Sequence, residues 1–344
     1  KSNIMGLAES WEKLKIENPK LRIRNAAKDL GVTEEELLVL GCGKQVTRLK
    51  SEFKELLLEI EKLGNVTAIT RNDDVVHERK GVYLNPSFHG MHVGLFVGAD
   101  IDLRLFLTSW KSVYAVSEGA EGSERNSIQF FAKDGQAIHK IYLNEKSNLD
   151  EFKAIVKNYK SDNQDTTTEV AASKPKEVTK PDSEIDIEGF KNKWNTLKDT
   201  HDFFGMLKEF GVSRTQALRL APEGKTKKIG NDSTRGILEL AAKEQVPIMV
   251  FVGNQGAIQI HTGEVNKLME YGEWFNVMDP DFNLHLKEAS ISETWLVKKP
   301  TEDGTVTSIE VFNESGELIV QFFGKRKPGI PELESWREIC SQLK

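Results

Sequence analysis

The residue whose surroundings point most directly to chemistry is a histidine at the start of an expected helix. His201 stands in the stretch Asp199-Thr-His-Asp-Phe-Phe-Gly-Met-Leu207, where Asp199 or Thr200 is the expected N-cap. A neutral imidazole beside apolar, aromatic and methionine side chains is a donor that suits an iron centre in an apolar pocket. A histidine at a helix start is also a common surface or capping residue, so the pattern alone leaves both interpretations open.

Arg104 is a second candidate, within the stretch Asp100-Ile-Asp-Leu-Arg-Leu-Phe106. Strict alternation predicts a strand in which Arg104 shares a face with Asp102 and Phe106, opposite two leucines. A salt-bridged strand arginine is the ordinary interpretation of this pattern.

Other titratable residues have less specific patterns. His77 is flanked by charged residues, which is typical of a solvated turn or strand end. His89 and His92 could together bind a metal ion, but the glycine-containing loop between them adds no carboxylate or cysteine as a further ligand, which argues against a metal site. Several basic side chains of the C-terminal part could neutralise the carboxylate groups of an otherwise apolar ligand. Most of these side chains are equally explained as ordinary solvated surface residues. These cations are Arg214, Lys298, Lys299, Lys325, Arg326 and Lys327.

Composition and motifs exclude several classes of protein. The chain has 47 Lys and Arg against 53 Asp and Glu, a formal charge of −6 that argues against nucleic acid as a partner. It contains no phosphate-binding glycine loop, nucleophile elbow, zinc-ligand spacing, or flavin or nicotinamide fingerprint. Cys42 and Cys340 lie near opposite ends, which predicts no disulfide framework and favours a reducing cytoplasm. We expect no membrane span and no signal peptide, because the sequence shows neither a long apolar stretch nor an apolar signal core.

The elements that must position these residues occur twice. Residues 127–138 match 308–319 at an offset of 181 (308 − 127), and residues 26–33 match 206–213 at an offset of 180 (206 − 26). Residues 72–81 likewise match 254–263, and Arg104 falls opposite His285. Position 201 falls opposite Asn18 or Leu21, so the duplication predicts one histidine ligand per chain.

The duplication also predicts the domain organisation. Segment 161–186 is polar, contains Pro175 and Pro181, and reads as a flexible linker between domains 1–160 and 187–344. Each domain begins with helices whose capping boxes start at Thr33 and Ser213, and continues with strands joined by tight turns. The expected class is α+β, each repeat forming a large, mostly antiparallel sheet flanked by helices.

Several long strings resemble the HemS/ChuS family of bacterial haemin-degrading and haem-transport proteins. The resemblance covers nearly the whole chain. In the second repeat it rests on residues 199–207, 248–254, 258–263, 295–301 and 321–326, and in the first on residues 77–83 and 99–106.

This resemblance implies a haem site between the sheet of the C-terminal repeat and its helices. His201 matches the family's proximal iron ligand, and Arg104 matches an arginine that reaches the distal side from the other repeat; both are expected to be catalytic. His77 matches a histidine that the family keeps in its first repeat, and we do not expect it to contact haem. Arg214 and Lys299 match positions near the propionates, and the pocket wall is expected to comprise Phe251, Gln321, Phe323 and Arg326. Phe323 stands where some relatives carry tyrosine, so we expect the hydrogen bond of that tyrosine to be absent.

The function implied is that of a cytoplasmic haem-binding protein that degrades haem to release iron. An inner-membrane haem importer would deliver the haem, and NADH, NADPH or an electron-donating reductase would supply electrons, because the chain itself carries no redox fingerprint. The alternative is a non-enzymatic haem carrier or buffer that hands haem to another enzyme. A third interpretation, binding of another apolar ligand or a protein partner, applies only if haem does not bind.

Overall fold

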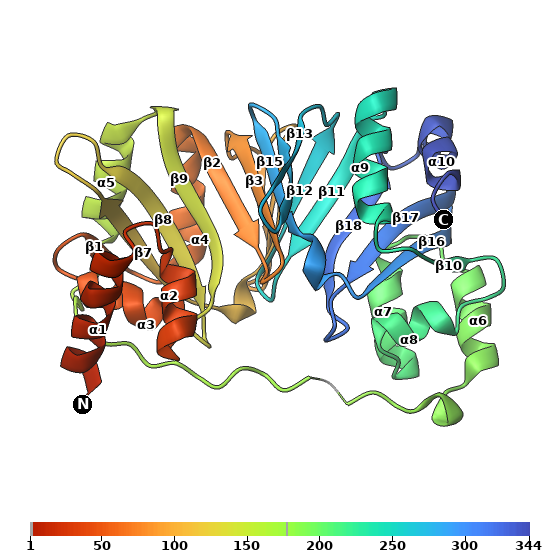
Figure 1. The fold of residues 1–344 in the computed structure, drawn as a ribbon, viewed down its shortest axis with the longest axis horizontal. Helices are drawn as coiled ribbons and strands as arrows, with labels where there is room; N and C mark the ends of the chain where they lie inside the picture. Colours follow the sequence, from red (N-terminus) through yellow and green to blue (C-terminus); the bar gives the residue numbers. More distant parts are fainter. Residues whose placement is uncertain (1–2, 177) are drawn as a thin grey trace. The chain divides into compact units, whose positions relative to one another are not determined.

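A computed structural model describes residues 3–176 and 178–344, which cluster into two compact units. Unit 1 takes residues up to Arg71, Glu78–Lys174 and Asn254–Gln259, and unit 2 takes Asn72–His77, Pro175–Gly253 and Ile260–Lys344. Figure 1 follows the chain through both units by colour. Each unit therefore contains a six-residue segment from the other half of the sequence.

The first half of the chain contains five α-helices and nine strands among its described residues. The helices are α1 (Asn3–Glu17), α2 (Ile23–Leu30), α3 (Glu34–Leu38), α4 (Phe53–Glu59) and α5 (Leu149–Tyr159), with short 3-10 turns at Val39–Gly41, Ile60–Leu63 and Leu107–Ser109. The strands are β1 (Val46–Leu49), β2 (Gly64–Arg71), β3 (Val75–Gly81), β4 (Pro86–His89), β5 (Val93–Val97), β6 (Asp102–Phe106), β7 (Trp110–Glu118), β8 (Arg125–Ala132) and β9 (Ala137–Ser147).

The second half repeats this plan. Its helices are α6 (Ile187–Asn195), α7 (Asp202–Phe210), α8 (Arg214–Arg219), α9 (Ser233–Glu244) and α10 (Glu334–Ser341), with 3-10 turns at Asp182–Glu184 and Glu288–Ser290. Its strands are β10 (Thr226–Ile229), β11 (Ile248–Gly253), β12 (Ala257–Gly263), β13 (Leu268–Tyr271), β14 (Trp274–Met278), β15 (Phe282–Lys287), β16 (Glu293–Thr301), β17 (Gly304–Phe312) and β18 (Leu318–Gly324).

The strands form two nine-stranded sheets with the orders β1-β7-β8-β9-β2-β3-β15-β14-β13 and β10-β16-β17-β18-β11-β12-β6-β5-β4. The first six positions of one sheet are the repeat equivalents of the first six positions of the other. Neighbours such as β7 and β8, or β16 and β17, pair antiparallel. These sheets and their helices confirm the predicted α+β class.

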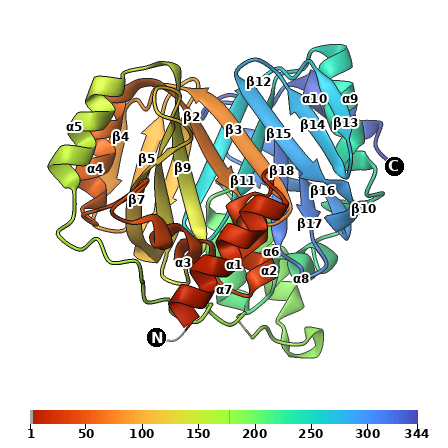
Figure 2. The same ribbon diagram turned by 60° about the vertical axis from the view of Figure 1, so that its left-hand side comes forward.

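Each unit has its own apolar core. In unit 2, one face of β11 buries Ile248, Val250 and Val252 in a cluster with residues of α9 and α10, while the alternate residues of the strand are only half-buried. A second cluster joins α6, α7 and α8 to Trp295 and Val297 of β16, and Figure 1 shows these three helices grouped together. In unit 1, α4 and α5 lie side by side and bury leucines and a phenylalanine against the strands (Figure 2). The half-buried face of β11 includes Met249 and Phe251.

The local signals at the helix ends agree with the prediction. Thr33 and Glu36 form a complete capping box at α3, and Ser213 and Gln216 form one at α8. Helices α2 and α7 are repeat equivalents that both end at a glycine in the left-handed conformation, with φ of 69° at Gly31 and 68° at Gly211. In the second repeat, Gly211 ends α7 and the capping box at Ser213 begins α8, so α8 starts directly after the helix that follows His201.

Segment 161–182 makes hydrogen bonds along its course. In unit 1, the Arg48 guanidinium donates to the carbonyls of Asp165 and Thr167. In unit 2, the Gln216 side chain donates to the Lys180 carbonyl at 2.9 Å and to Asp182 at 2.7 Å. The flexibility expected for 161–186 stays a prediction. Among the described residues, no helix is both long and apolar enough to cross a bilayer.

The two exchanged segments are held by equivalent asparagines. In unit 2, Asn72 accepts from the amides of Asp74 and Val75, and its Nδ2 donates to the Gly253 and Ile319 carbonyls at 3.2 and 2.9 Å. In unit 1, the matching Asn254 accepts from two amides of its own turn and donates to the carbonyls of Arg71 and Ile138 at 2.9 and 2.8 Å. Each asparagine therefore forms four hydrogen bonds that anchor a turn from one half of the sequence in the other half's unit.

We predict that Asn72→Ala and Asn254→Ala each lower the free energy of unfolding by about 2–4 kcal/mol, because each removes four hydrogen bonds and leaves backbone groups unpaired. Urea titration measures the change. The control is Asn266→Ala, because the Asn266 side chain is exposed, and it should lie within about 0.5 kcal/mol of the unchanged protein. Equal stability of all three variants would contradict the anchoring role.

Candidate functional site

His201 is held through one ring nitrogen and open at the other. Asp199 Oδ1 accepts from the His201 backbone amide at 2.9 Å and from Nδ1 at 2.8 Å. Nε2 has no hydrogen-bond partner among residues 3–176 and 178–344, and the side chain is 84% exposed. A histidine whose Nδ1–H is fixed by a carboxylate presents the Nε2 lone pair in a defined direction, which is the usual arrangement of a metal-binding histidine.

The start of α7 differs from the sequence expectation. Asp199 and Thr200 were the expected N-caps, but the helix begins at Asp202 and His201 occupies the cap position without a side-chain capping bond. The physical reason is that the Asp199 carboxylate is already engaged by His201, and the backbone between them forms a turn in which the Asp202 amide donates to the Asp199 carbonyl. The hydrogen bond from the His201 backbone amide, helped by the charge of Arg326, lowers the pKa of Asp199.

Arg326 lies close enough to this turn for its charge to act on Asp199. Its Nη2 is 3.8 Å from Asp303 Oδ2, its side chain is largely buried, and its Nε has no hydrogen-bond partner within the described parts of the chain. Arg326 therefore places a positive charge near the carboxylate that holds the His201 ring.

A buried ion network lies in the same unit. The Glu310 carboxylate on β17 is fully buried and accepts from Arg214 Nε at 2.6 Å and from Lys299 Nζ at 3.1 Å. Burial alone would raise the pKa of Glu310, but the Arg214 and Lys299 charges outweigh it and lower this pKa to about 2. Burial lowers the pKa of Lys299 to about 8, against the opposing effect of Glu310. At neutral pH the network therefore consists of one anion between two cations.

Glu310 is a residue that the sequence reasoning missed. Its repeat equivalent is Gln129, at an offset of 181 (310 − 129), within the most clearly matched block of the duplication. A neutral residue in one repeat and a charged one in the other, at a position expected to be a strand interior, was the signal that could have found it.

The network contacts the first turn of α7 through an aromatic ring. Lys299 Nζ lies 4.0 Å from the centroid of the Phe203 ring, and the Arg214 guanidinium carbon lies 5.4 Å from it. The Trp194 ring packs edge-on to Phe203, with centroids 5.1 Å apart at 85°. Phe203 therefore connects the charges of the sheet with the helix that His201 begins.

The predicted wall residues share one face of the same sheet. Gln321 of β18 is the register partner of both Glu310 on β17 and Phe251 on β11. The Phe251 and Phe323 rings meet with centroids 5.1 Å apart, and the Phe251 side chain is only half-buried. The structure thus brings Arg214, Lys299, Phe251, Gln321 and Phe323 together on one face, and brings Arg326 close enough for its charge to act on Asp199. Their roles towards a ligand stay a prediction.

Arg104 lies in unit 1, on β6. The expected alternation is confirmed, because Leu103 and Leu105 are fully buried while Arg104 is 32% exposed. Its Nη1 donates to Asp102 Oδ1 at 2.8 Å. Burial raises the pKa of Asp102, and Arg104 partly offsets the rise. The arginine therefore forms the ordinary strand salt bridge, and its distal role stays a prediction.

His77 does not lie in the solvated turn that its charged neighbours indicated. It is fully buried, its Nε2 lies 3.2 Å from the Val250 carbonyl oxygen, and its ring packs 5.0 Å from that of Phe282. The reason is that Asn72–His77 is one of the two exchanged segments and enters the core of unit 2. His89 and His92 are exposed, and the described residues contain no cluster of three metal-binding side chains.

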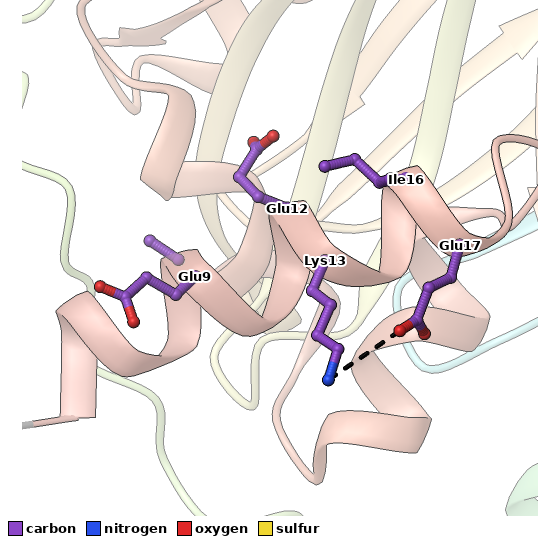
Figure 3. Close-up of a pocket in the computed structure, with 6 residues that line it drawn as sticks. Glu9, Glu12, Lys13, Ile16 and Glu17 are labelled. Carbon is purple, nitrogen blue, oxygen red and sulfur yellow. Dashed lines mark ion pairs between the residues drawn. The ribbon is translucent and has the colours of Figure 1, made fainter.

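A shallow hollow runs along α1 and is lined by residues of that helix alone, including Glu12, Ile16 and Glu17 (Figure 3). The labelled side chains point outward, and Lys13 lies 3.9 Å from Glu17. None of the predicted site residues takes part in this hollow.

Comparison with known proteins gives a consistent result. The model of the haemin-degrading HemS.ChuX domain matches twice, over residues 31–159 and 211–343, which confirms the duplication. The hemin transport protein HemS of Yersinia enterocolitica is 37% identical over 344 residues, with 97% of this chain and 96% of that protein covered.

Two solved structures resemble the whole chain. Holo-PhuS, a heme-binding protein from Pseudomonas aeruginosa, is 43% identical with a TM-score of 0.97, and 99% of each chain is covered. The heme degrading enzyme ChuS of Escherichia coli O157:H7 is 34% identical with a TM-score of 0.91, again with 99% of each chain covered. The chain therefore belongs to the haemin-degrading HemS/ChuX domain family.

Proposed function

We propose that this protein binds haem, with His201 as the ligand of the iron. The observation that carries the proposal is the His201 ring, whose Nδ1 is fixed by Asp199 at 2.8 Å while Nε2 is left open. A carboxylate partner on the far nitrogen holds the ring in place and strengthens the donor. The similarity of the chain to the heme-binding protein PhuS supports haem as the molecule that this protein binds.

The surroundings of His201 in unit 2 suit the rest of a haem molecule. The half-buried Phe251, whose ring packs against that of the buried Phe323, offers an aromatic surface to a flat apolar ring. Arg214 and Lys299 together exceed the charge of Glu310 by one positive unit, so the net charge of this network favours a ligand with carboxylate tails.

For activity, we propose that the protein opens the haem macrocycle and releases iron in the cytoplasm. Haem iron supplies the redox chemistry of such a reaction, and electrons must come from NADH, NADPH or a reductase, since the chain carries no redox fingerprint. Arg104 would stabilise negative charge that develops during the reaction on the distal face of the haem, opposite His201. An inner-membrane importer is the expected source of haem. The similarity to ChuS, a heme degrading enzyme, favours this function.

The alternative function is haem transport without degradation. The similarity to HemS and HmuS of Yersinia, which are hemin transport proteins, favours this alternative. The same histidine and the same apolar surface would serve a carrier.

We predict that His201→Ala lowers haem affinity at least about 100-fold and changes the Soret band, because the iron loses its protein ligand. Absorbance titration with haem measures both. His92→Ala is the matched control, since His92 is also exposed, and it should bind like the unchanged protein. Wild-type affinity and an unchanged spectrum for His201→Ala would rule out the ligand assignment.

A second prediction separates degradation from transport. When the haem complex is mixed with NADPH and a reductase in the presence of catalase, we expect loss of the Soret band and release of iron. Catalase is required because free peroxide bleaches haem without any enzyme. An unchanged Soret band would favour the carrier.

We predict that Arg104→Ala retains haem, alters the spectrum of the distal side and slows degradation roughly 10–1,000-fold, the range typical for loss of a group that stabilises developing charge. Single-turnover rates measure the effect. Arg104→Lys keeps the charge and should recover part of the rate. If Arg104→Ala degrades haem at the unchanged rate, Arg104 has no part in the reaction.

A further inference from the structure

The position of Lys299 differs from that expected of a residue that simply contacts a ligand. Its side chain is only 4% exposed, its Nζ donates to Glu310, and the same ammonium lies over the face of the Phe203 ring at 4.0 Å. A buried lysine that already has both an anionic and an aromatic partner has little left to offer a ligand, because binding it would require breaking these contacts.

Phe203 is the residue through which Lys299 can act on His201. It is the second residue of α7, is 2% exposed, and lies two positions after His201. Its ring is enclosed by the Trp194 ring on one side and by the two cations of the network on another. Because Trp194 Nε1 also donates to the Lys298 carbonyl at 3.1 Å, the whole arrangement is tied to β16.

The first repeat provides an internal comparison. At the matching positions it carries Ile23 for Phe203, Glu118 for Lys299 and Gln129 for Glu310, at offsets of 180 (203 − 23) and 181 (299 − 118; 310 − 129). Gln129 is buried there and donates to Ser127 at 3.0 Å instead of receiving a cation. The aromatic ring, the lysine and the carboxylate therefore occur together only in the repeat that contains His201.

We propose that Lys299 and Glu310 are positioning residues: Glu310 holds the Lys299 ammonium beneath Phe203, and this contact fixes the first turn of α7 and with it the direction of His201. Neither residue needs to touch the ligand. The inference deepens the proposed function and rests on His201 as the iron ligand, but its first consequence, a fixed helix start, exists without haem.

The test uses Lys299→Met, which keeps the apolar stem and removes the charge, and Lys299→Arg, which keeps a cation. Lys298→Met is the matched control, because Lys298 is the exposed neighbour on the same strand. Lys299→Met leaves the Glu310 carboxylate paired with Arg214 alone. The double variant Lys299→Met with Glu310→Gln returns the network to its net charge of +1 and introduces at position 310 the residue of the first repeat. If Lys299→Met alone fails to fold, the double variant provides the measurement.

The first measurement is amide hydrogen exchange in haem-free full-length protein. We expect exchange in residues 202–210 to become about tenfold faster in Lys299→Met and in the double variant, because a desolvated cation–aromatic contact is lost. Lys299→Arg should restore most of the protection, and Lys298→Met should match the unchanged protein.

The second measurement is the absorption spectrum and affinity of the haem complex. We expect Lys299→Met and the double variant to shift the Soret band and weaken binding about tenfold, with recovery in Lys299→Arg. Weaker binding with unchanged exchange in residues 202–210 would overturn the inference, because it would mean that Lys299 contacts the ligand directly. Unchanged exchange together with unchanged binding would also overturn it. Failure of the proposed function is recognised separately, by His201→Ala binding haem normally, whatever the exchange of α7.

Discussion

The need to neutralise one buried carboxylate organises the candidate site. Removing one partner from a buried ion pair typically costs about 3–5 kcal/mol of folding free energy. The Glu310 carboxylate therefore requires cationic side chains that are held within hydrogen-bond distance of its oxygens. Arg214 supplies charge from the first turn of α8, and Lys299 supplies it from β16. These contacts fix the start of a helix against two strands. The capping box of Ser213 and Gln216 places Arg214 at that start, so a local helix signal and a buried charge determine the same position.

Both repeats pair a charged residue at a helix start with an oppositely charged residue of the sheet, but the positions of the two charges are reversed between the repeats. In unit 1 the first residue of α3, Glu34, is buried and pairs with Lys140 of β9 at 2.6 Å. In unit 2 the matching helix residue is the cation Arg214, and the carboxylate comes from the sheet. Lys299 then adds a second cation, where the first repeat has the exposed Glu118. A ligand with carboxylate tails is therefore favoured by the charges of unit 2 and not by those of unit 1, which agrees with a single histidine ligand per chain.

Much of the fold could be predicted from sequence because its signals are local or repeated. The capping boxes, the alternation around Arg104 and the duplication all depend on short stretches of residues, and the structure confirms each of them. The burial of His77 could not be predicted, since its neighbours along the chain are charged and its environment comes from the exchange of Asn72–His77 into unit 2. The Glu310 network was missed for a related reason: its partners are 96 and 11 residues away in the sequence, and they meet only through the packing of α8 on the sheet and the pairing of β16 with β17.

Helix α7 combines a buried face that is structurally constrained with an exposed face that is free for binding. Phe203, Met206 and Leu207 are buried in the core with α6 and α8, so the helix cannot rotate without losing that packing. His201 and Phe204 lie three positions apart, which places them on one side of the helix. The Phe204 side chain is 62% exposed, and Lys208 extends over its ring at 4.8 Å. An apolar ligand held by His201 would cover Phe204 and gain the free energy of burying an aromatic side chain, in addition to the iron–nitrogen bond. Phe204 is thus an exposed aromatic side chain on the same side of the helix as His201, and its burial would add to the free energy of binding.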